Sequence, residues 1–217
     1  MTSPTQTSGF DLDDSSESAL EWLKQHARQV GIGAIVVVAL AGVFWVVRTQ
    51  NEGNEETASR QLVAAQRSVG AGNLPLAAAD LRKLVDRYGS TRSGAEAQVL
   101  LAQVELQQGK TADAMKVLDA IGSGGTMAAS VHALRAAALE QSGKPTEAAA
   151  EYLKAASANQ LQGESESLKA DAARAYLAAG KKDEALKIWK EMAANPASVL
   201  YNEALLRVGE LSAQAIQ

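Results

Sequence analysis

Hydrophobic and polar positions divide the chain into a polar leader, one uncharged apolar run and a long amphipathic remainder. The uncharged run covers Val30–Val47 and lies between Arg28 and Arg48. Eighteen residues of α-helix reach about 27 Å, close to the thickness of the hydrocarbon core of a bilayer. Apolar side chains would cover every side of this helix, so a soluble fold would have to enclose it completely. The run therefore predicts a membrane-spanning helix over 30–48.

The ends of the run favour a retained anchor over a cleaved signal peptide. The leader before it is long and acidic, and no A-x-A-like pair of small residues follows it. Trp45 fits an aromatic side chain at the membrane interface, and the glycines are candidate positions for helix packing. The residues singled out in the span are Val30, Gly31, Gly33, Gly42, Trp45 and Val47.

Charge does not decide on which side of the membrane the remainder lies. Lys24 and Arg28 precede the run, and Arg48, Arg60 and Arg67 follow it, so neither side has a clear excess of basic residues. The chain has no cysteine, which suits either compartment. The orientation stays open on the residues alone.

The predicted organisation has four parts. Residues 1–29 form a short disordered or amphipathic leader, 30–48 the membrane helix, 49–56 a linker or a continuation of that helix, and 57–217 one domain. This domain is rich in Ala, Leu, Gln, Glu and Lys and poor in aromatic residues and proline, so we expect an all-α fold. The net charge of the chain, −4 at pH 7, gives no indication of a basic surface that would bind nucleic acid.

A repeated glycine organises the domain. Each copy is followed by a short polar turn and, five residues on, by an alanine. The glycines are 37, 34 and 37 residues apart, a period typical of stacked helical hairpins. Each glycine suits the left-handed end of a first helix, and the polar residues after it begin a second helix. The four pairs are Gly72 with Ala77, Gly109 with Ala114, Gly143 with Ala148, and Gly180 with Ala185.

Small and large side chains follow the same register. A small residue stands seven positions before each glycine, and a larger apolar residue stands nine positions after it. This arrangement allows neighbouring helices to interlock. The small residues are Ala65, Ala102, Ala136 and Ala173, and the large ones are Leu81, Leu118, Tyr152 and Trp189.

These residues resemble the tetratricopeptide repeat, a pair of helices with small residues at the crossing and a large apolar residue in the second helix. The resemblance covers about 57–196 and is weaker in the first unit, where Ser68 replaces a large apolar residue. It implies a right-handed superhelix of about four repeats. Ser198–Ala213 reads as a final helix covering the exposed end. Gly122–Gly125 and Asn159–Gly163 read as longer turns.

No pattern supports catalysis, a metal or a cofactor. The two histidines lie far apart, and His132 reads as a surface or groove residue. Glu164, Glu166 and Asp171 are spaced as solvated helix positions and N-terminal helix charges. The glycines at 122–125 lack the strand and the Lys-Ser/Thr pair of a phosphate loop. We therefore expect no enzyme activity, no cofactor and no small-molecule substrate.

A stacked array instead presents the first helices of successive repeats to an extended peptide or a partner helix. The side chains expected on that groove are polar and of mixed charge. They are Gln66, Glu96, Gln103, Gln107, Glu140, Gln141 and Arg174. Repeats that grip chaperone C-termini use a Lys/Asn/Arg clamp, whereas the corresponding positions here are Val99, Gln103, Ala133, Ala137 and Ala170, which disfavours that ligand class.

Together, the acidic leader, the single span and the repeat domain resemble the YfgM-type ancillary subunits of the bacterial SecYEG translocon. The stretches that carry this resemblance are Leu101–Gln107, Ala112–Ala114, Val117–Ile121 and Ala185–Pro196. It implies a single-pass protein of the bacterial inner membrane, with a cytoplasmic N-terminus and a periplasmic domain. Its implied partners are translocon subunits, periplasmic chaperones and exported clients.

Three other readings remain open. The chain could be an envelope-assembly or cell-division scaffold of the same repeat class, although it lacks the cysteine that lipidation requires. It could be an adaptor that faces the cytoplasm. An enzyme with an unrecognised site is the third reading.

Overall fold

The computed structural model describes residues 26, 42, 45, 52–122 and 124–213, and the chain divides into two compact units, Met1–Gly53 and Asn54–Gln217. Most of the predicted span lies outside the described residues, including Val30, Gly31, Gly33 and Val47. Gly42 and Trp45 are described, and both are helical and exposed. Within the described residues, no helix combines the length and the apolar character needed to cross a membrane. The span stays a prediction.

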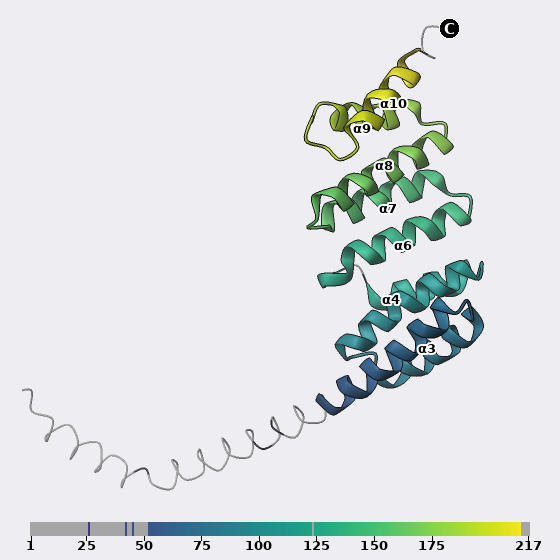
Figure 1. Ribbon diagram of the computed structural model, residues 1–217, viewed down its shortest axis with the longest axis vertical. Coiled ribbons are helices and arrows are strands. Elements are labelled where there is room, and N and C mark those ends of the chain that lie inside the picture. Colours follow the sequence, from purple (N-terminus) through teal and green to yellow (C-terminus); the bar gives the residue numbers. More distant parts are fainter. Residues whose placement is uncertain (1–25, 27–41, 43–44, 46–51, 123, 214–217) are drawn as a thin grey trace, which may run out of the picture. The chain divides into compact units, whose positions relative to one another are not determined.

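The second unit is a stack of helical hairpins (Figure 1). All its described elements are helical, and its first helix covers 54–70. The labelled elements that follow are α3 (Leu74–Tyr88), α4 (Arg92–Gln107), α5 (Thr111–Ile121), the 3₁₀ turn η1 (Gly125–Met127), α6 (Ala128–Gln141), α7 (Pro145–Ala158), α8 (Gln162–Ala178), α9 (Lys182–Ala193) and α10 (Tyr201–Ala213). The all-α fold of the repeat domain is confirmed.

The four repeated glycines end the first helices, as their spacing predicts. Their φ angles are 75°, 74°, 71° and 73° at Gly72, Gly109, Gly143 and Gly180, in the left-handed region that glycine adopts without strain. At the second of these turns, the Gly109 N–H donates to the Leu106 carbonyl and the Lys110 N–H to the Glu105 carbonyl, at 2.9 and 2.8 Å. This pair of bonds is a Schellman motif, which satisfies carbonyls that a helix end otherwise leaves unpaired.

The interlocking positions are buried in every hairpin. The four alanines five residues after the glycines are fully buried, as are Leu81, Leu118 and Trp189 among the large residues. Tyr152 is 9% exposed. The small residues at 65, 102, 136 and 173 are at most 1% exposed. Because an alanine lets two helix axes approach closely, the large side chain of a neighbouring helix can fill the space beside it.

Two hydrogen-bonded carboxylates connect different hairpins. Glu55, on the first helix, accepts hydrogen bonds from the backbone N–H and the hydroxyl of Ser93 at the start of α4, at 3.1 and 2.6 Å. Glu105, buried on α4, forms an ion pair with Arg82 of α3. The Ser93 hydroxyl is the main cause of a lowered pKa at Glu55.

Four details differ from the sequence interpretation. The final helix begins at Tyr201 rather than at Ser198, because the residues between them form a turn. In the second longer turn, Gln162 and Gly163 already belong to α8, and in the first a 3₁₀ turn begins at Gly125. Glu166, interpreted as a solvated helix position, is only 8% exposed.

Candidate functional site

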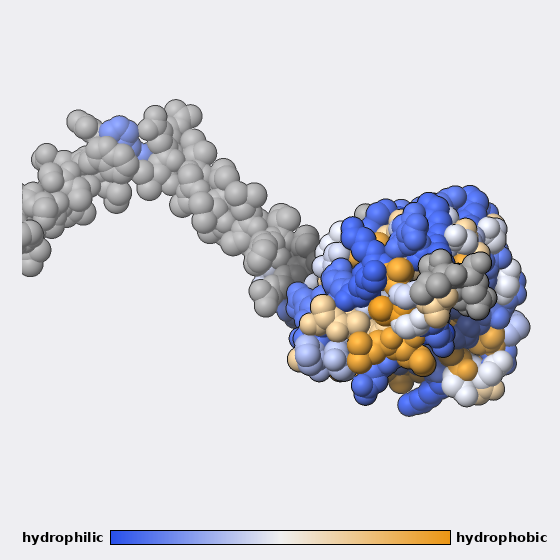
Figure 2. Space-filling model, turned by 90° about the horizontal axis from the view of Figure 1, so that it is seen from above, coloured by the Kyte–Doolittle hydropathy of each residue, from blue (hydrophilic) through white to orange (hydrophobic). Residues whose placement is uncertain are grey.

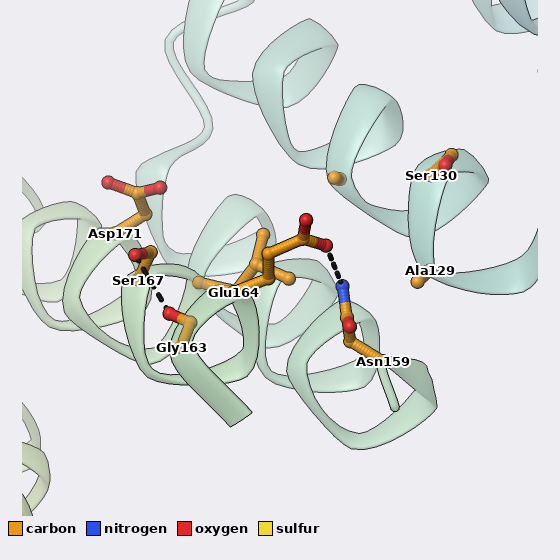
Figure 3. Close-up of a pocket in the computed structure, with 9 residues that line it drawn as sticks. Ala129, Ser130, Asn159, Gly163, Glu164, Ser167 and Asp171 are labelled. Atoms are coloured by element: carbon orange, nitrogen blue, oxygen red, sulfur yellow. Dashed lines mark hydrogen bonds between the residues drawn. The ribbon is translucent and has the colours of Figure 1, made fainter. Parts of the chain in front are cut away.

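A pocket of about 390 Å³ opens between α6 and α8, which are the first helices of successive hairpins (Figure 3). One wall comes from α6, the other from α8, and the turn before α8 closes one end. The lining residues are Ala129, Ser130, Ala133, Asn159, Gly163, Glu164, Ser167, Leu168 and Asp171.

Small residues on α6 create the space. Ala129, Ser130 and Ala133 recur at helical spacing along one side of that helix, so no long side chain fills the gap to α8. Figure 3 shows Ala129 and Ser130 on a helix facing the α8 residues. A protruding side chain of a partner can therefore enter without displacing a residue of the array.

The α8 wall carries hydrogen-bond acceptors and an apolar side chain. Glu164 accepts a hydrogen bond from the Asn159 side-chain amide at 2.9 Å, and Asp171 forms an ion pair with Arg174 at 2.6 Å. Leu168 supplies the apolar surface between them. Carboxylate oxygens have more acceptor sites than these single contacts use, so the wall suits donor groups such as backbone amides and basic side chains.

The seven residues predicted for the groove fall into two groups. Gln66, Gln103 and Gln107 are exposed on first helices, and Glu96 is partly exposed and forms an ion pair with Arg92 at 3.3 Å. These four side chains remain available to a partner. Their binding role stays a prediction.

The other three predicted groove residues make contacts within the array. Glu140 accepts a hydrogen bond from the Tyr152 hydroxyl at 2.8 Å. Burial, with this hydrogen bond as a smaller cause, raises the pKa of that hydroxyl. Gln141 accepts from the Thr111 hydroxyl at 3.1 Å and so connects two hairpins. Both side chains therefore hold neighbouring helices together, a role that sequence reasoning did not assign to them.

Arg174 connects α8, α9 and α10. Its guanidinium pairs with Asp171 and with Glu203, the latter at 3.0 Å, and lies 5.9 Å from the centre of the buried Trp189 ring. Burial opposes its charge, but the Glu203 and Asp171 carboxylates outweigh that effect and raise its pKa. Arg174 therefore fixes one carboxylate of the pocket wall.

The pocket residues themselves were missed by sequence reasoning. Of the nine, only Ala133 is a predicted groove position, as one that lacks the clamp residue, and the pattern predicts Glu164 and Asp171 as solvated helix positions or N-terminal helix charges. The available signal was the series of small residues at 129, 130 and 133 on a predicted first helix. Its meaning depends on the distance between α6 and α8, which the sequence pattern does not contain.

His132 is not a surface or groove residue. Its Nδ1 lies 2.6 Å from a Glu151 oxygen on α7, and the two side chains are 13% and 14% exposed. The contact between His132 and Glu151 connects α6 to α7. Among the described residues, no group of three or more His, Asp or Glu side chains could hold a metal ion.

The architecture is that of a helical repeat array, a class of fold that serves mainly as a scaffold for protein interactions. The family profile of the Tetratricopeptide repeat-like domain matches residues 20–208, and the chain belongs to this family. This confirms the repeat class predicted from the glycine register. No curated protein matches the chain.

Solved repeat proteins share the fold. A tetratricopeptide repeat protein from Parabacteroides merdae superposes with a TM-score of 0.59 at 15% identity, covering 73% of this chain and 61% of that protein. A Podosopora anserina putative kinesin light chain with nearly identical TPR-like repeats gives 0.60 at 20% identity, covering 74% and 89%. At these identities the likeness extends to the fold alone.

Proposed function

We propose that this chain is a membrane-tethered adaptor that binds protein segments along its first helices. The pocket between α6 and α8 carries the proposal, because it combines open space, apolar lining residues and acceptor groups on the surface where repeat arrays engage peptides. An extended segment with a basic or donor side chain fits these walls.

The proposed setting is the bacterial inner membrane, beside the Sec translocon. The uncharged run at 30–47 supports the tether, and the resemblance to YfgM-type subunits supports the partners and a periplasmic array. In this role the array would meet exported chains and recruit periplasmic chaperones. Tethering confines the array to a layer near the membrane, so weak contacts gain an effective concentration that free solution does not provide.

Removing the span tests the tether. A chain lacking residues 30–47 is expected to keep its helical circular dichroism but to lose co-purification with translocon subunits. A matched control replaces the same run with an unrelated apolar helix of equal length. Full association without any span contradicts the tethering role.

Protease accessibility tests the orientation. In intact spheroplasts, added protease is expected to digest residues 55–217 while a cytoplasmic control protein survives. Protection until the cell membrane is broken would instead place the array in the cytoplasm and favour the cytoplasm-facing adaptor.

Filling the pocket tests the binding surface. Ala133→Trp places a large ring between α6 and α8 and is expected to lower recovery of crosslinked partners at least several-fold. Ala120→Trp, at an exposed position of α5, is the matched control and is expected to leave recovery unchanged. Equal recovery from both variants would remove the pocket from the proposal.

A further inference from the structure

The outward side of α10 is apolar, and no other described residue of the chain covers it. Leu206 is 61% exposed and Leu205 46%, and Gly209 and Ala213 are exposed on the same helix. Figure 2 looks down on this end of the array and shows hydrophobic residues gathered on the exposed face among hydrophilic ones. A terminal helix that only ended the stack would be expected to present a polar outer face.

The repeat register explains which side of α10 this is. The small residues of the first helices stand at 65, 102, 136 and 173, and Gly209 continues the series 36 residues further on. On α8, Ala170 and Ala173 are fully buried. The positions 36 residues later are Leu206 and Gly209. The exposed side of α10 thus corresponds to the side that α8 buries.

Glycine at 209 has no packing reason within the array. A methyl group added there would meet no atom within 4 Å. Glycine inside a helix is destabilising relative to alanine. Close approach of another helix at this point would account for it, as it does for the alanines at the equivalent positions.

We infer that this side of α10 pairs with α10 of a second copy of the chain, running antiparallel. The exposed residues Asn202, Leu206, Gly209 and Ala213 are spaced by four, three and four, so a two-fold axis between 207 and 208 brings the pattern onto itself. Each large residue then lies opposite a small one, with Leu206 against Gly209 of the partner subunit. A second copy of the same helix supplies both the large and the small residues of this alternation.

Charge does not oppose the pairing. The three charged side chains of α10 already have partners, since Glu203 pairs with Arg174 at 3.0 Å and Arg207 with Glu210 at 2.9 Å. One pair of helices of this length buries less than the roughly 1,200–2,000 Å² of a stable interface. The contact is therefore weak and reversible. A covalent crosslink between the two copies detects such a contact better than a measurement of molecular mass in solution.

The absence of cysteine from the chain allows a disulfide test on the full-length protein. Two differently tagged copies are co-expressed in membranes, one carrying Asn202→Cys and the other Ala213→Cys, and oxidised mildly. The antiparallel register brings 202 next to 213 of the partner, whereas two copies of either single variant hold their cysteines about 16 Å apart along the helices. A disulfide requires Cα atoms within about 7 Å.

We expect the mixed pair to crosslink at least tenfold faster than either variant alone. Adding Leu206→Asp to both copies should abolish the difference, while Leu161→Asp, at an equally exposed leucine before α8, should leave it intact. Equal rates in the mixed and single samples, or persistence of the crosslink with Leu206→Asp, would overturn the pairing.

Discussion

The carboxylate of Glu166 accepts a hydrogen bond from the hydroxyl of Ser198 at 2.8 Å, and both residues are buried. It also accepts from the Val199 N–H at 2.9 Å and from the Gln162 side chain at 3.0 Å. Burial alone would raise the pKa of this carboxyl, but the Ser198 and Gln162 hydrogen bonds, with the Val199 N–H, hold it below its ordinary value. A single side chain on α8 thus fixes the segment that leads into α10.

Removing that carboxylate should loosen the C-terminal end of the array. Glu166→Ala leaves the Ser198 hydroxyl and the Val199 N–H without their acceptor, so we expect the free energy of unfolding to fall by about 1–3 kcal/mol. Hydrogen exchange should accelerate most in α10. Chemical denaturation together with exchange mass spectrometry measures both effects.

Glu164→Ala is the matched control for this variant. Glu164 lies on the same helix but is exposed and accepts one side-chain hydrogen bond, from Asn159. Its loss should cost less than about 0.5 kcal/mol. Equal costs at the two positions would show that the Ser198 contact does not hold α10.

Replacing Glu166 with glutamine should change the pH dependence of the free energy of unfolding. A carboxyl whose pKa is lower in the folded than in the unfolded state stabilises the fold above its unfolded pKa of about 4.3, and this stabilisation is lost as pH falls through the folded pKa. The difference in unfolding free energy between the wild type and Glu166→Gln should therefore be constant from pH 7 to about 5. It should shrink as the pH falls below about 4.

Denaturant titrations at several pH values provide this measurement. Glu55 also has a lowered pKa and is present in both proteins, so its contribution cancels in the difference. A difference that stays constant down to pH 3 would mean that Glu166 is not ionised preferentially in the folded state.

The sequence was sufficient for the parts of the fold that repeat. Helix ends at Gly109 and Gly143, the buried alanines and the large residue Trp189 follow from local backbone and size requirements, which recur in register. The burial of Glu166 could not be predicted in this way, because it depends on Ser198, 32 residues away in the chain. The pocket at Ala133 likewise depends on the spacing between two helices rather than on either helix alone.

Glycine should be required at the left-handed hairpin turn of Gly143 and dispensable at Gly70 in the first helix. Gly143 has a φ of 71°, which an L residue adopts only with strain, although a methyl group there would meet no atom within 4 Å. Gly143→Ala should therefore lower the free energy of unfolding by about 1–2 kcal/mol. Gly70 is helical with the same open space, and Gly70→Ala should be neutral or stabilising by up to about 1 kcal/mol.

Thermal and denaturant unfolding of these two variants separates backbone strain from steric crowding, because neither site is crowded. A loss of similar size at both glycines would contradict the assignment of Gly143 to a left-handed turn.

The ion pair between Arg82 and Glu105 should contribute far more to the free energy of unfolding than the surface ion pair between Lys83 and Asp80. The Glu105 side chain is 1% exposed, and its Oε2 atom has no hydrogen-bond partner, with the Lys110 ammonium 4.0 Å away. Arg82→Ala would leave this buried carboxylate with Lys110 alone, so we expect a loss of about 1–3 kcal/mol in unfolding free energy. Lys83→Ala removes an exposed pair with Asp80 at 3.7 Å and should cost less than about 0.5 kcal/mol.

A second substitution distinguishes an uncompensated charge from lost packing at the same site. Adding Glu105→Leu to Arg82→Ala removes the stranded carboxylate, and because a buried pair is often replaceable by apolar residues, stability should recover by at least half of the loss. Guanidinium unfolding of the two single variants and the double variant completes the comparison. If the double variant is less stable than Arg82→Ala alone, then the buried carboxylate of Glu105 is stabilising without its arginine, and the cost of Arg82→Ala arises from the packing of the arginine stem across α3 and α4.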